Sequence, residues 1–308
     1  MINPAIVVAV DGTEPSLAAA RWAAREARDS DRPLRILYVL DWDWAPGRSD
    51  YSGQRFDGPT HYSLADKRFD TVRRMADDIT GRAAAEAREV APGITVDTDV
   101  IIGNPAGQLV VSSEQADLMV LGSRGRGGFA SLALGSVSQR VAAHAHCPVA
   151  VIRGRADAGT GPVAAGIDDA ASSARVLEAA FTAARTRGAS LTVIRSYLPV
   201  QPLYYDRYPP ADVTAAEQDD EERARLGDQL MPWRAKYPDV SVEALLSHDT
   251  AAALLTGASH TAQLVIVGSH GHGVLAGTVI GSTGLQLLHH ADCPVLIVRP
   301  YSKRDVHR

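Results

Sequence analysis

Cysteine is scarce in this chain, which has two in 308 residues. Two cysteines are too few for a disulfide framework, and because neither Cys147 nor Cys293 belongs to a Cys-x-x-Cys pair, a redox or metal role is the less favoured interpretation. We expect both to be small, semi-buried residues in a reducing, cytoplasmic protein. Long apolar runs are missing as well. No segment approaches the roughly 18 apolar residues of a membrane span, and the N-terminus lacks a basic region followed by a long apolar core, so we expect neither an anchor nor a signal peptide.

Positive charge is not in excess either. Lys and Arg number 31 against 36 Asp and Glu, which gives a formal net charge of -5. Nucleic acids and anionic membranes are bound by clustered Lys and Arg that displace counterions, so we expect neither as a partner. With 45% hydrophobic and 22% charged residues, the composition is typical of a folded protein. The length suits two domains of about 150 residues.

The sequence repeats itself. Residues 118–153 align without a gap on residues 264–299, with 14 identities in 36 positions. Closer to the N-terminus, VVAVDGTEPS at 7–16 matches AAGIDDAASS at 164–173. The chain therefore contains two copies of one unit.

The two copies differ in length within residues 41–78. The offset between matching residues falls there from 157 to 146, so the first copy carries 11 extra residues. The segment DWDWAPGRSDYSGQRFDGPTHYS in this region is turn-rich and aperiodic, and we interpret it as a surface excursion. We place two domains at 1–154 and 155–308, joined by the short linker RGRADAGTG at 153–161.

Each copy alternates strand-type and helix-type patterns. The apolar run AIVVAV is followed by EPSLAAARWAAREARDS, in which apolar residues recur at helical spacing behind a capping-type Thr13. Strands that are apolar throughout and separated by helices are typical of a parallel sheet covered on both faces. The sequence therefore predicts an α/β fold, with two tandem copies of a five-stranded, parallel, doubly wound sandwich. In the first copy the expected strands are 5–10, 34–40, 94–102, 117–123 and 148–153, and the expected helices are 14–30, 67–90, 105–115 and 135–145.

Two glycine-rich segments occupy the same place in the two copies: GSRGRGGFASLALGS at 122–136 and GSHGHGVLAGTVIGS at 268–282. Each follows a strand, so each lies at the carboxyl edge of its sheet, where open α/β folds bind ligands. Gly135 and Ser136 begin a helix, whose first N–H groups and positive dipole end attract an anion. The two earlier glycines let backbone N–H groups approach a phosphate. The pattern is typical of phosphate binding, but it is neither a Walker A motif nor the Rossmann fingerprint.

Simpler interpretations stay open. The glycines could serve only a tight turn between strand and helix, and Asp11 could only cap the helix that follows it. The acidic run EQDDEERAR at 217–225 is interpreted as an exposed helix face. Three histidines are expected near helix C-termini, where a partly charged imidazole favours the dipole: His144, His289 and His290.

These features resemble the universal stress protein family. The resemblance is carried by the pattern Gly-x2-Gly-x9-Gly-Ser after VLGS or IVGS, by VDGT or IDDA at the end of the first strand, and by CPVAVIR or CPVLIVR closing each copy. It covers essentially the whole chain, and the duplication is similar to the tandem, two-domain type. The resemblance implies a Rossmann-like, adenine nucleotide alpha hydrolase-like fold that binds ATP, with or without Mg2+. Adenine would lie near the ends of the first two strands and the phosphates in the glycine loop.

Carried onto this sequence, the resemblance implies one nucleotide site in each copy. Asp11 and Val39 would border the adenine of the first site, and the glycine loop would hold ribose and phosphates. The implied residues are Asp11, Val39, Gly103, Gly122, Ser123, Arg124, Gly125, Gly135, Ser136 and Val137 in the first copy, and Asp168, Gly268, Ser269, Gly271, Gly281, Ser282 and Thr283 in the second.

The second copy departs from the family pattern. Asp169 stands where the first copy has Gly12, and HDTAAALL stands where the first has GNPAGQLV, so the Gly-x-Pro turn is missing. The second glycine loop carries His270 and His272 in place of two arginines. We therefore expect the second site to bind nucleotide more weakly, with pH sensitivity near the histidine pKa.

The sequence favours a regulator over an enzyme. Phosphoryl transfer needs a metal-binding carboxylate near the terminal phosphates and a group that positions the nucleophile, and one carboxylate per site is thin support for catalysis. Our leading hypothesis is a nucleotide-sensing protein of the stress response, with at most slow ATP hydrolysis and with a partner protein that the sequence does not identify. The alternative is an enzyme of the adenine nucleotide alpha-hydrolase type acting on a small substrate.

The closing strand of each copy, PVAVIR or PVLIVR, is short, apolar and of edge type. Because an uncovered apolar edge is a liability that pairing removes, we expect the two copies to pair through these strands about a pseudo-twofold axis. We expect whole chains to form a homodimer in addition.

Overall fold

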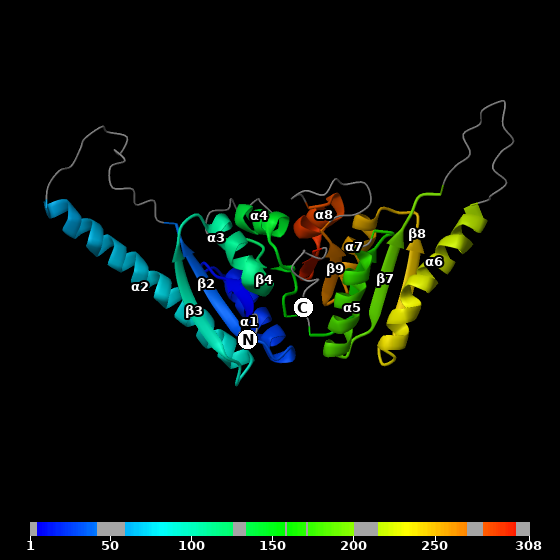
Figure 1. Ribbon diagram of the computed structural model, residues 1–308, viewed down its shortest axis with the longest axis horizontal. Coiled ribbons are helices and arrows are strands. Elements are labelled where there is room, and N and C mark those ends of the chain that lie inside the picture. Colours follow the sequence, from blue (N-terminus) through cyan, green and yellow to red (C-terminus); the bar gives the residue numbers. More distant parts are fainter. Residues whose placement is uncertain are drawn as a thin grey trace, which may run out of the picture. The chain divides into compact units, whose positions relative to one another are not determined.

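The computed structural model describes residues 5–41, 59–125, 134–157, 159–170, 172–199, 215–269 and 280–299. The chain divides into two compact units. The first comprises Met1–Val141 with Ala145–Cys147, and the second comprises Ala142–His144 with Pro148–Arg308. Each unit alternates strands and helices, and Figure 1 labels the elements in chain order.

The first unit is a parallel sheet covered by helices on both faces. Its strands are ordered β3-β2-β1-β4, and all of the described pairings between them are parallel. α1 and α2 pack against each other on one face, and α3 and α4 lie on the other (Figure 1). The elements are β1 (Ala5–Ala9), α1 (Glu14–Asp29), β2 (Leu34–Leu40), α2 (Pro59–Val90), β3 (Val96–Ile102), α3 (Pro105–Ser112), the 3-10 turn η1 (Ser113–Gln115), β4 (Ala116–Gly122) and α4 (Ser136–His144).

The second unit repeats this arrangement. Its strands are ordered β5-β10-β9-β6-β7-β8, and the five strands β6 to β10 pair in parallel. α5 contacts α6, while α7 contacts α8. The elements are β5 (Val149–Ile152), β6 (Val163–Ile167), α5 (Ser173–Arg187), β7 (Leu191–Ser196), α6 (Ala215–Lys236), β8 (Val242–Ser247), α7 (Ala251–Ser259), β9 (Leu264–Gly268), α8 (Ser282–His290) and β10 (Val295–Val298). The predicted α/β fold with a mostly parallel sheet is confirmed.

β5 pairs antiparallel with β10 through Val149, Ala150 and Val151. The pairing predicted for the two closing strands is therefore confirmed, and it covers the apolar edge that each would otherwise expose. Because β5 groups with the second unit by its contacts, the domain boundary at residues 154 and 155 stays a prediction.

The segment that links the copies is held by hydrogen bonds. Arg155 donates its backbone N–H to Asp292 O at 2.7 Å, and its guanidinium donates to the carbonyls of Ser259 and Ala262. Arg153 donates to the carbonyls of Leu287 and His289 at the end of α8. The described part of the linker is therefore fixed to the second unit.

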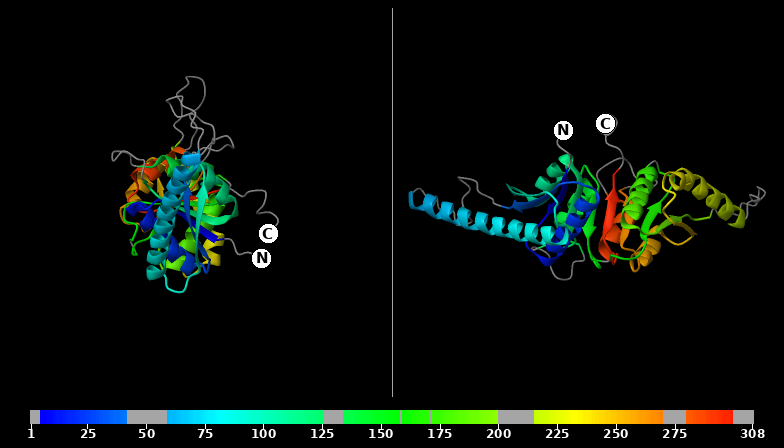
Figure 2. Two further views of the ribbon diagram at one scale, coloured as in Figure 1. Left: turned by 90° about the vertical axis from the view of Figure 1, so that its left-hand side faces the viewer. Right: turned by 90° about the horizontal axis from the view of Figure 1, so that it is seen from below.

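Residues 59–66 depart from the sequence prediction, which begins the helix at Lys67. α2 begins at Pro59, so part of the expected surface excursion is helical. Figure 2 shows the N-terminal end of α2 extending beyond the strands of the first unit. Proline is favoured at the first helical position, and the residues Leu64, Ala65 and Lys67 are good helix formers. Residues 42–58, with Trp42 and Trp44, lie outside the described residues.

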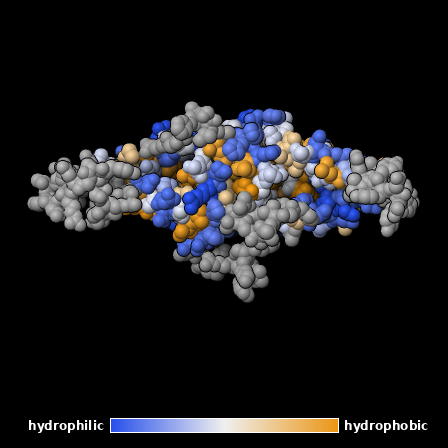
Figure 3. All heavy atoms as spheres, turned by 90° about the horizontal axis from the view of Figure 1, so that it is seen from above, coloured by the Kyte–Doolittle hydropathy of each residue, from blue (hydrophilic) through white to orange (hydrophobic). Residues whose placement is uncertain are grey.

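The cores of both units are formed by apolar strand residues and by the alanine-rich faces of the helices. Val8, Leu34, Ile36, Val149 and Leu264 are at most 1% exposed. Both cysteines lie at the start of a closing strand as predicted, without a disulfide, but they are fully rather than partly buried, and burial raises the pKa of Cys293 to about 12. On the face drawn in Figure 3, hydrophilic residues separate the hydrophobic groups. No helix in the described ranges is long and apolar enough to cross a membrane.

Candidate functional site

The residues expected to bind a ligand in the first copy meet at the carboxyl edge of its sheet. Asp11 follows β1, Val39 lies near the end of β2, Gly103 follows β3, and Gly122 ends β4. Gly103 has a φ of +143°, and its N–H donates to Leu40 O at 2.9 Å. β1 pairs with β2 on one side and with β4 on the other, so the order in which successive strands join the sheet reverses here, and open α/β sheets bind ligands in the crevice at such a point.

Asp11 is held by the first residues of α1. Its Oδ1 accepts hydrogen bonds from Thr13 N at 3.0 Å and from Thr13 Oγ1 at 2.6 Å, and its own N–H donates to Ser16 Oγ at 3.3 Å. Thr13 precedes α1 but its side chain makes no capping bond, so the expected Thr13 cap is wrong. The hydroxyl of Thr13 instead fixes the carboxylate of Asp11, which makes Asp11 part of the turn as well as of the crevice.

Packing requires glycine at the first two positions of the glycine loop. A Cβ on Gly122 would lie 2.8 Å from the carbonyl of Pro15, and one on Gly125 would lie 2.5 Å from Asp11 Oδ2. Gly122 therefore lies directly against the start of α1, and Gly125 lies against Asp11. Ser138 Oγ in turn donates to Gly122 O at 2.7 Å and ties the end of β4 to α4. Arg124 is exposed, and Arg126 lies outside the described residues.

The third glycine differs, because the fold does not require it. Gly135 precedes α4 with φ -75° and ψ 146°, a conformation open to any residue, and a Cβ there would be in ordinary contact at 3.5 Å from Ser123 O. No side chain caps α4, and the first bond within the helix runs from Gln139 N to Gly135 O. The N–H groups of Ser136 and Val137 therefore have no acceptor inside the helix. Ser136 is exposed at this helix start.

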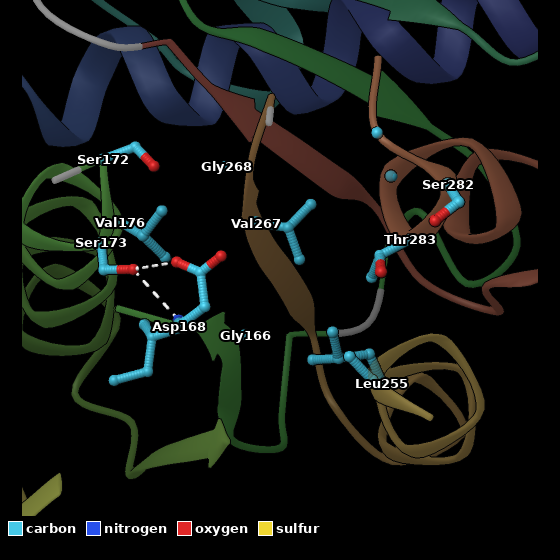
Figure 4. Close-up of a pocket in the computed structure, with 14 residues that line it drawn as sticks. Gly166, Asp168, Ser172, Ser173, Val176, Leu255, Val267, Gly268, Ser282 and Thr283 are labelled. Carbon is cyan, nitrogen blue, oxygen red and sulfur yellow. Dashed lines mark hydrogen bonds between the residues drawn. The ribbon is translucent and has the colours of Figure 1, made fainter. Parts of the chain in front are cut away.

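The second copy has an open cavity of about 270 Å³ at the matching edge. Asp168 and Ser173 line one side, Ser282 and Thr283 line the other, and Leu255 closes the floor (Figure 4). Asp168 Oδ1 accepts from Ala170 N at 2.9 Å and from Ser173 Oγ at 2.8 Å. The fixed carboxylate of Asp168 thus faces the start of α8 across the cavity, and apolar side chains lie between them.

The helix start on the far side repeats that of the first copy. Gly281 precedes α8 with φ -62° and ψ 158°, again without a side-chain cap. Its N–H donates to Ser269 O at 2.9 Å, and Leu285 N donates to Gly281 O at 3.0 Å. The N–H groups of Ser282 and Thr283 are consequently left without acceptors inside the helix and lie at the cavity. Gly268 lines the cavity and Ser269 is buried beside it.

Sequence reasoning missed the serines that position the two aspartates. Ser16 Oγ accepts from Asp11 N, and Ser173 Oγ accepts from Asp168 N at 3.1 Å, so the same bond occurs in both copies. The signal was present, because Ser16, the last residue of VVAVDGTEPS, aligns with Ser173, the last residue of AAGIDDAASS, at the same offset of 157. The apolar lining from Leu255 and Val176 was not visible, since α7 and α5 are far apart in the sequence.

The departures of the second copy have partial structural explanations. Thr250 replaces the Gly-x-Pro turn by capping α7, since its Oγ1 accepts from Ala253 N at 3.3 Å, as Asn104 Oδ1 accepts from Gly107 N in the first copy. Gly271, His270 and His272 lie outside the described residues, so their predicted roles are not tested. Within the described ranges, no group of three or more His, Cys, Asp or Glu could hold a metal ion.

Comparison with known proteins gives a consistent result. A model of the universal stress protein family matches residues 3–153 and again residues 160–299. A universal stress protein of Mycolicibacterium smegmatis is 32% identical over 298 residues, which covers 96% of this chain and 97% of that protein. One of Mycobacterium tuberculosis is 33% identical over 301 residues, with 96% of both chains covered. The crystal structure of a universal stress protein from Archaeoglobus fulgidus has a TM-score of 0.67 at 17% identity, covers 96% of this chain and 98% of that one, and shows the same fold. The chain therefore belongs to the universal stress protein family and consists of two tandem domains of that family.

Proposed function

We propose that this universal stress protein binds ATP in both copies and acts as a nucleotide sensor with at most slow hydrolysis. The observation that carries the proposal is the pair of uncapped helix starts, Gly135-Ser136 and Gly281-Ser282, at the carboxyl edges of the two sheets. In the second copy this helix start opens on a cavity, opposite a carboxylate.

Phosphate oxygens would accept hydrogen bonds from the first N–H groups of α4 and α8. These groups lack side-chain caps, and the positive end of the helix dipole favours an anion there. Ser136 and Ser282 each add a hydroxyl donor. Because the backbone and the packing at Gly135 tolerate a side chain, the tight-turn interpretation does not account for this glycine, whereas close approach by a phosphate does.

The nucleoside would lie between the helix start and the aspartate. In the second copy, Val176, Leu255 and Val267 supply an apolar surface for a ring, and Asp168 supplies an acceptor for ribose hydroxyls. Figure 4 shows the Asp168 carboxylate pointing into the space between α5 and β9. Asp11 holds the corresponding place in the first copy. Either carboxylate could reach Mg2+ through water, and Mg2+ would offset the charge of the phosphates.

Equilibrium dialysis with radiolabelled ATP tests the proposal. Gly135→Glu and Gly281→Glu each place a negative side chain at one helix start, and each is expected to abolish one site and leave the other. Gly257→Glu is the matched control, because Gly257 lies in α7 away from the cavity lining, with nothing within 4 Å of its Cβ position. Loss of stoichiometry in the two site variants but not in the control supports the proposal, and unchanged stoichiometry in all three contradicts it.

Self-association of whole chains is part of the same proposal. β5 and β10 pair with each other edge to edge, and this pairing already explains why both strands are apolar. A homodimer, if formed, must therefore use other surfaces. The mass measured by light scattering at micromolar concentration distinguishes a dimer from a single chain.

A further inference from the structure

Arg195 in β7 is a buried charge at the carboxyl edge of the second sheet. Its side chain is 3% exposed, and it donates from Nε to Glu222 at 2.9 Å, from Nη1 to Gln229 at 3.2 Å and from Nη2 to Asp169 at 2.7 Å. Burial opposes its charge, but the hydrogen bonds that Arg195 donates to Asp169 and Glu222 outweigh burial and raise its pKa. A buried charge is tolerated when carboxylates compensate it in this way, and removal of one partner is costly.

The partners of Arg195 join α6 to the loop that carries Asp168. Asp169 immediately follows Asp168, and Gln229 Nε2 also lies 3.4 Å from Asp168 O as a donor. Glu222 and Gln229 both belong to α6. The carboxylate that lines the cavity is thus positioned from two sides, by Ser173 within the loop and by α6 through the arginine.

This arrangement corrects the interpretation of the acidic run 217–225 as a wholly exposed helix face. The side chains of Asp220 and Glu221 are 80% and 64% exposed, but that of Glu222 is 12% exposed because it turns inward to Arg195. Asp219 turns inward as well, since it accepts from Tyr197 Oη and lies 2.8 Å from His248 Nε2. α6 is therefore tied to the carboxyl ends of β6, β7 and β8.

At the positions that match Asp169 and Arg195, the first copy carries no charge. Gly12 stands in place of Asp169, and the buried Tyr38 stands in place of Arg195. Gly12 has a φ of +84°, and a Cβ there would lie 3.1 Å from Ile79 Cγ1 in α2. The loop of the first site rests on an apolar side chain, whereas that of the second site rests on charges. Asp169 and Arg195 are therefore the two departures of the second copy that give its site this charged support.

We propose that the Asp169–Arg195–Glu222 network makes nucleotide binding in the second cavity depend on the position of α6. Arg195 and Asp169 are positioning residues that act through Asp168. The inference rests on the proposed ATP binding and adds its regulation. Because coupling is reciprocal, ATP in the second site stabilises the docked position of α6, and a partner that displaces α6 weakens ATP binding there. The first site, which lacks the network, does not respond in this way.

The test uses the full chain carrying Gly135→Glu, so that only the second site binds. In this background, Asp169→Asn keeps the size of the side chain and removes its charge. We expect the Kd for ATP to rise about tenfold, which corresponds to 1.4 kcal/mol. Asp169→Glu is expected to restore much of the affinity. Glu221→Gln is the matched control, because Glu221 is also a carboxylate of α6 but is exposed and forms its ion pair with the exposed Arg225.

Hydrogen exchange separates coupling from a purely structural role. ATP should protect the amides of α6 in the Gly135→Glu chain and should no longer do so after Asp169→Asn, while α2 is unaffected in both. An unchanged Kd with Asp169→Asn, or ATP binding without protection of α6, would overturn the inference and leave the proposed function intact. If the Gly135→Glu chain binds no ATP, nucleotide binding in the second copy fails and the inference falls with it.

Discussion

Replacement of Gly122 by alanine tests how the first site is built. A Cβ there would lie 2.8 Å from the carbonyl carbon and oxygen of Pro15 and 3.0 Å from Ser16 N, all of them backbone atoms. Since non-bonded carbons normally approach to about 3.5 Å, the start of α1 must move by roughly 0.7 Å. Overpacking of this kind costs about 1–3 kcal/mol. Lower entropy of the unfolded chain offsets about 0.4–1 kcal/mol, which leaves a net loss of about 1–2 kcal/mol.

The displacement should also weaken ATP binding in the first copy. Ser16 accepts the N–H of Asp11, so a shift of α1 moves the carboxylate at the crevice. The Gly122→Ala chain should melt about 3–6 °C below the wild-type chain, and dialysis should show fewer moles of ATP bound per chain. Gly81→Ala is the control, because Gly81 lies inside α2 with nothing within 4 Å of its Cβ position. The same chemical change should there stabilise by about 0.5–1 kcal/mol.

The decisive result is that Gly122→Ala lowers the free energy of unfolding whereas Gly81→Ala raises it. A Gly122→Ala chain that melts at the wild-type temperature and binds ATP with wild-type stoichiometry would refute the close packing of β4 on α1. Equal destabilisation by Gly81→Ala would show that the loss is unrelated to the contact with Pro15.

Three further predictions concern the second unit. Gly154 has a φ of +53° and its Cβ would overlap Asp292 O, so Gly154→Ala should lower the free energy of unfolding by about 2 kcal/mol or more in urea titrations, and a neutral result would contradict the linker geometry. Burial, with the charges of His290 and Arg153, lowers the pKa of His289, so the unfolded chain binds a proton that the folded chain resists. The free energy of unfolding should therefore fall as the pH drops below about 6.5. In melts from pH 5 to 8, the melting temperature of His289→Gln should depend less on pH than that of the wild-type chain, and an equal dependence in both chains would contradict this prediction. The Cys293 thiol, with a pKa of about 12, should react with Ellman's reagent only after unfolding, and rapid reaction of the native chain would be contrary to its burial.

The sequence predicted those parts of the fold whose signal is local. The strand at 34–40 was located to the residue, because an apolar run that only Arg35 interrupts is typical of a buried strand. The start of α2 was missed, because the turn-rich residues before Pro59 obscured a helix whose first turn needs no special sequence. Glu222 was misread because neighbouring carboxylates on a helix point in different directions, and only the tertiary structure shows which one reaches Arg195.

The candidate sites were predicted in part for the same reason. The glycine spacing located both helix starts, since Gly-Ser before a helix is a local pattern. The cavity itself was not predictable, because Val176, Leu255 and Thr283 come from helices that only the fold brings together. The histidine predictions were similarly limited, since a position at a helix end favours a charged imidazole, but burial beside Arg153 favours the neutral form of His289.

The most direct measurement of the central claim is chromatography of the nucleotide released when freshly purified protein is denatured, expressed as moles per chain. The account predicts intact ATP at one to two moles per wild-type chain, with the first site lost in Gly135→Glu and the second in Gly281→Glu. No adenine nucleotide in the purified protein, and none bound after addition of Mg2+ and ATP, would contradict the account and reduce the repeated glycines to turns between strand and helix.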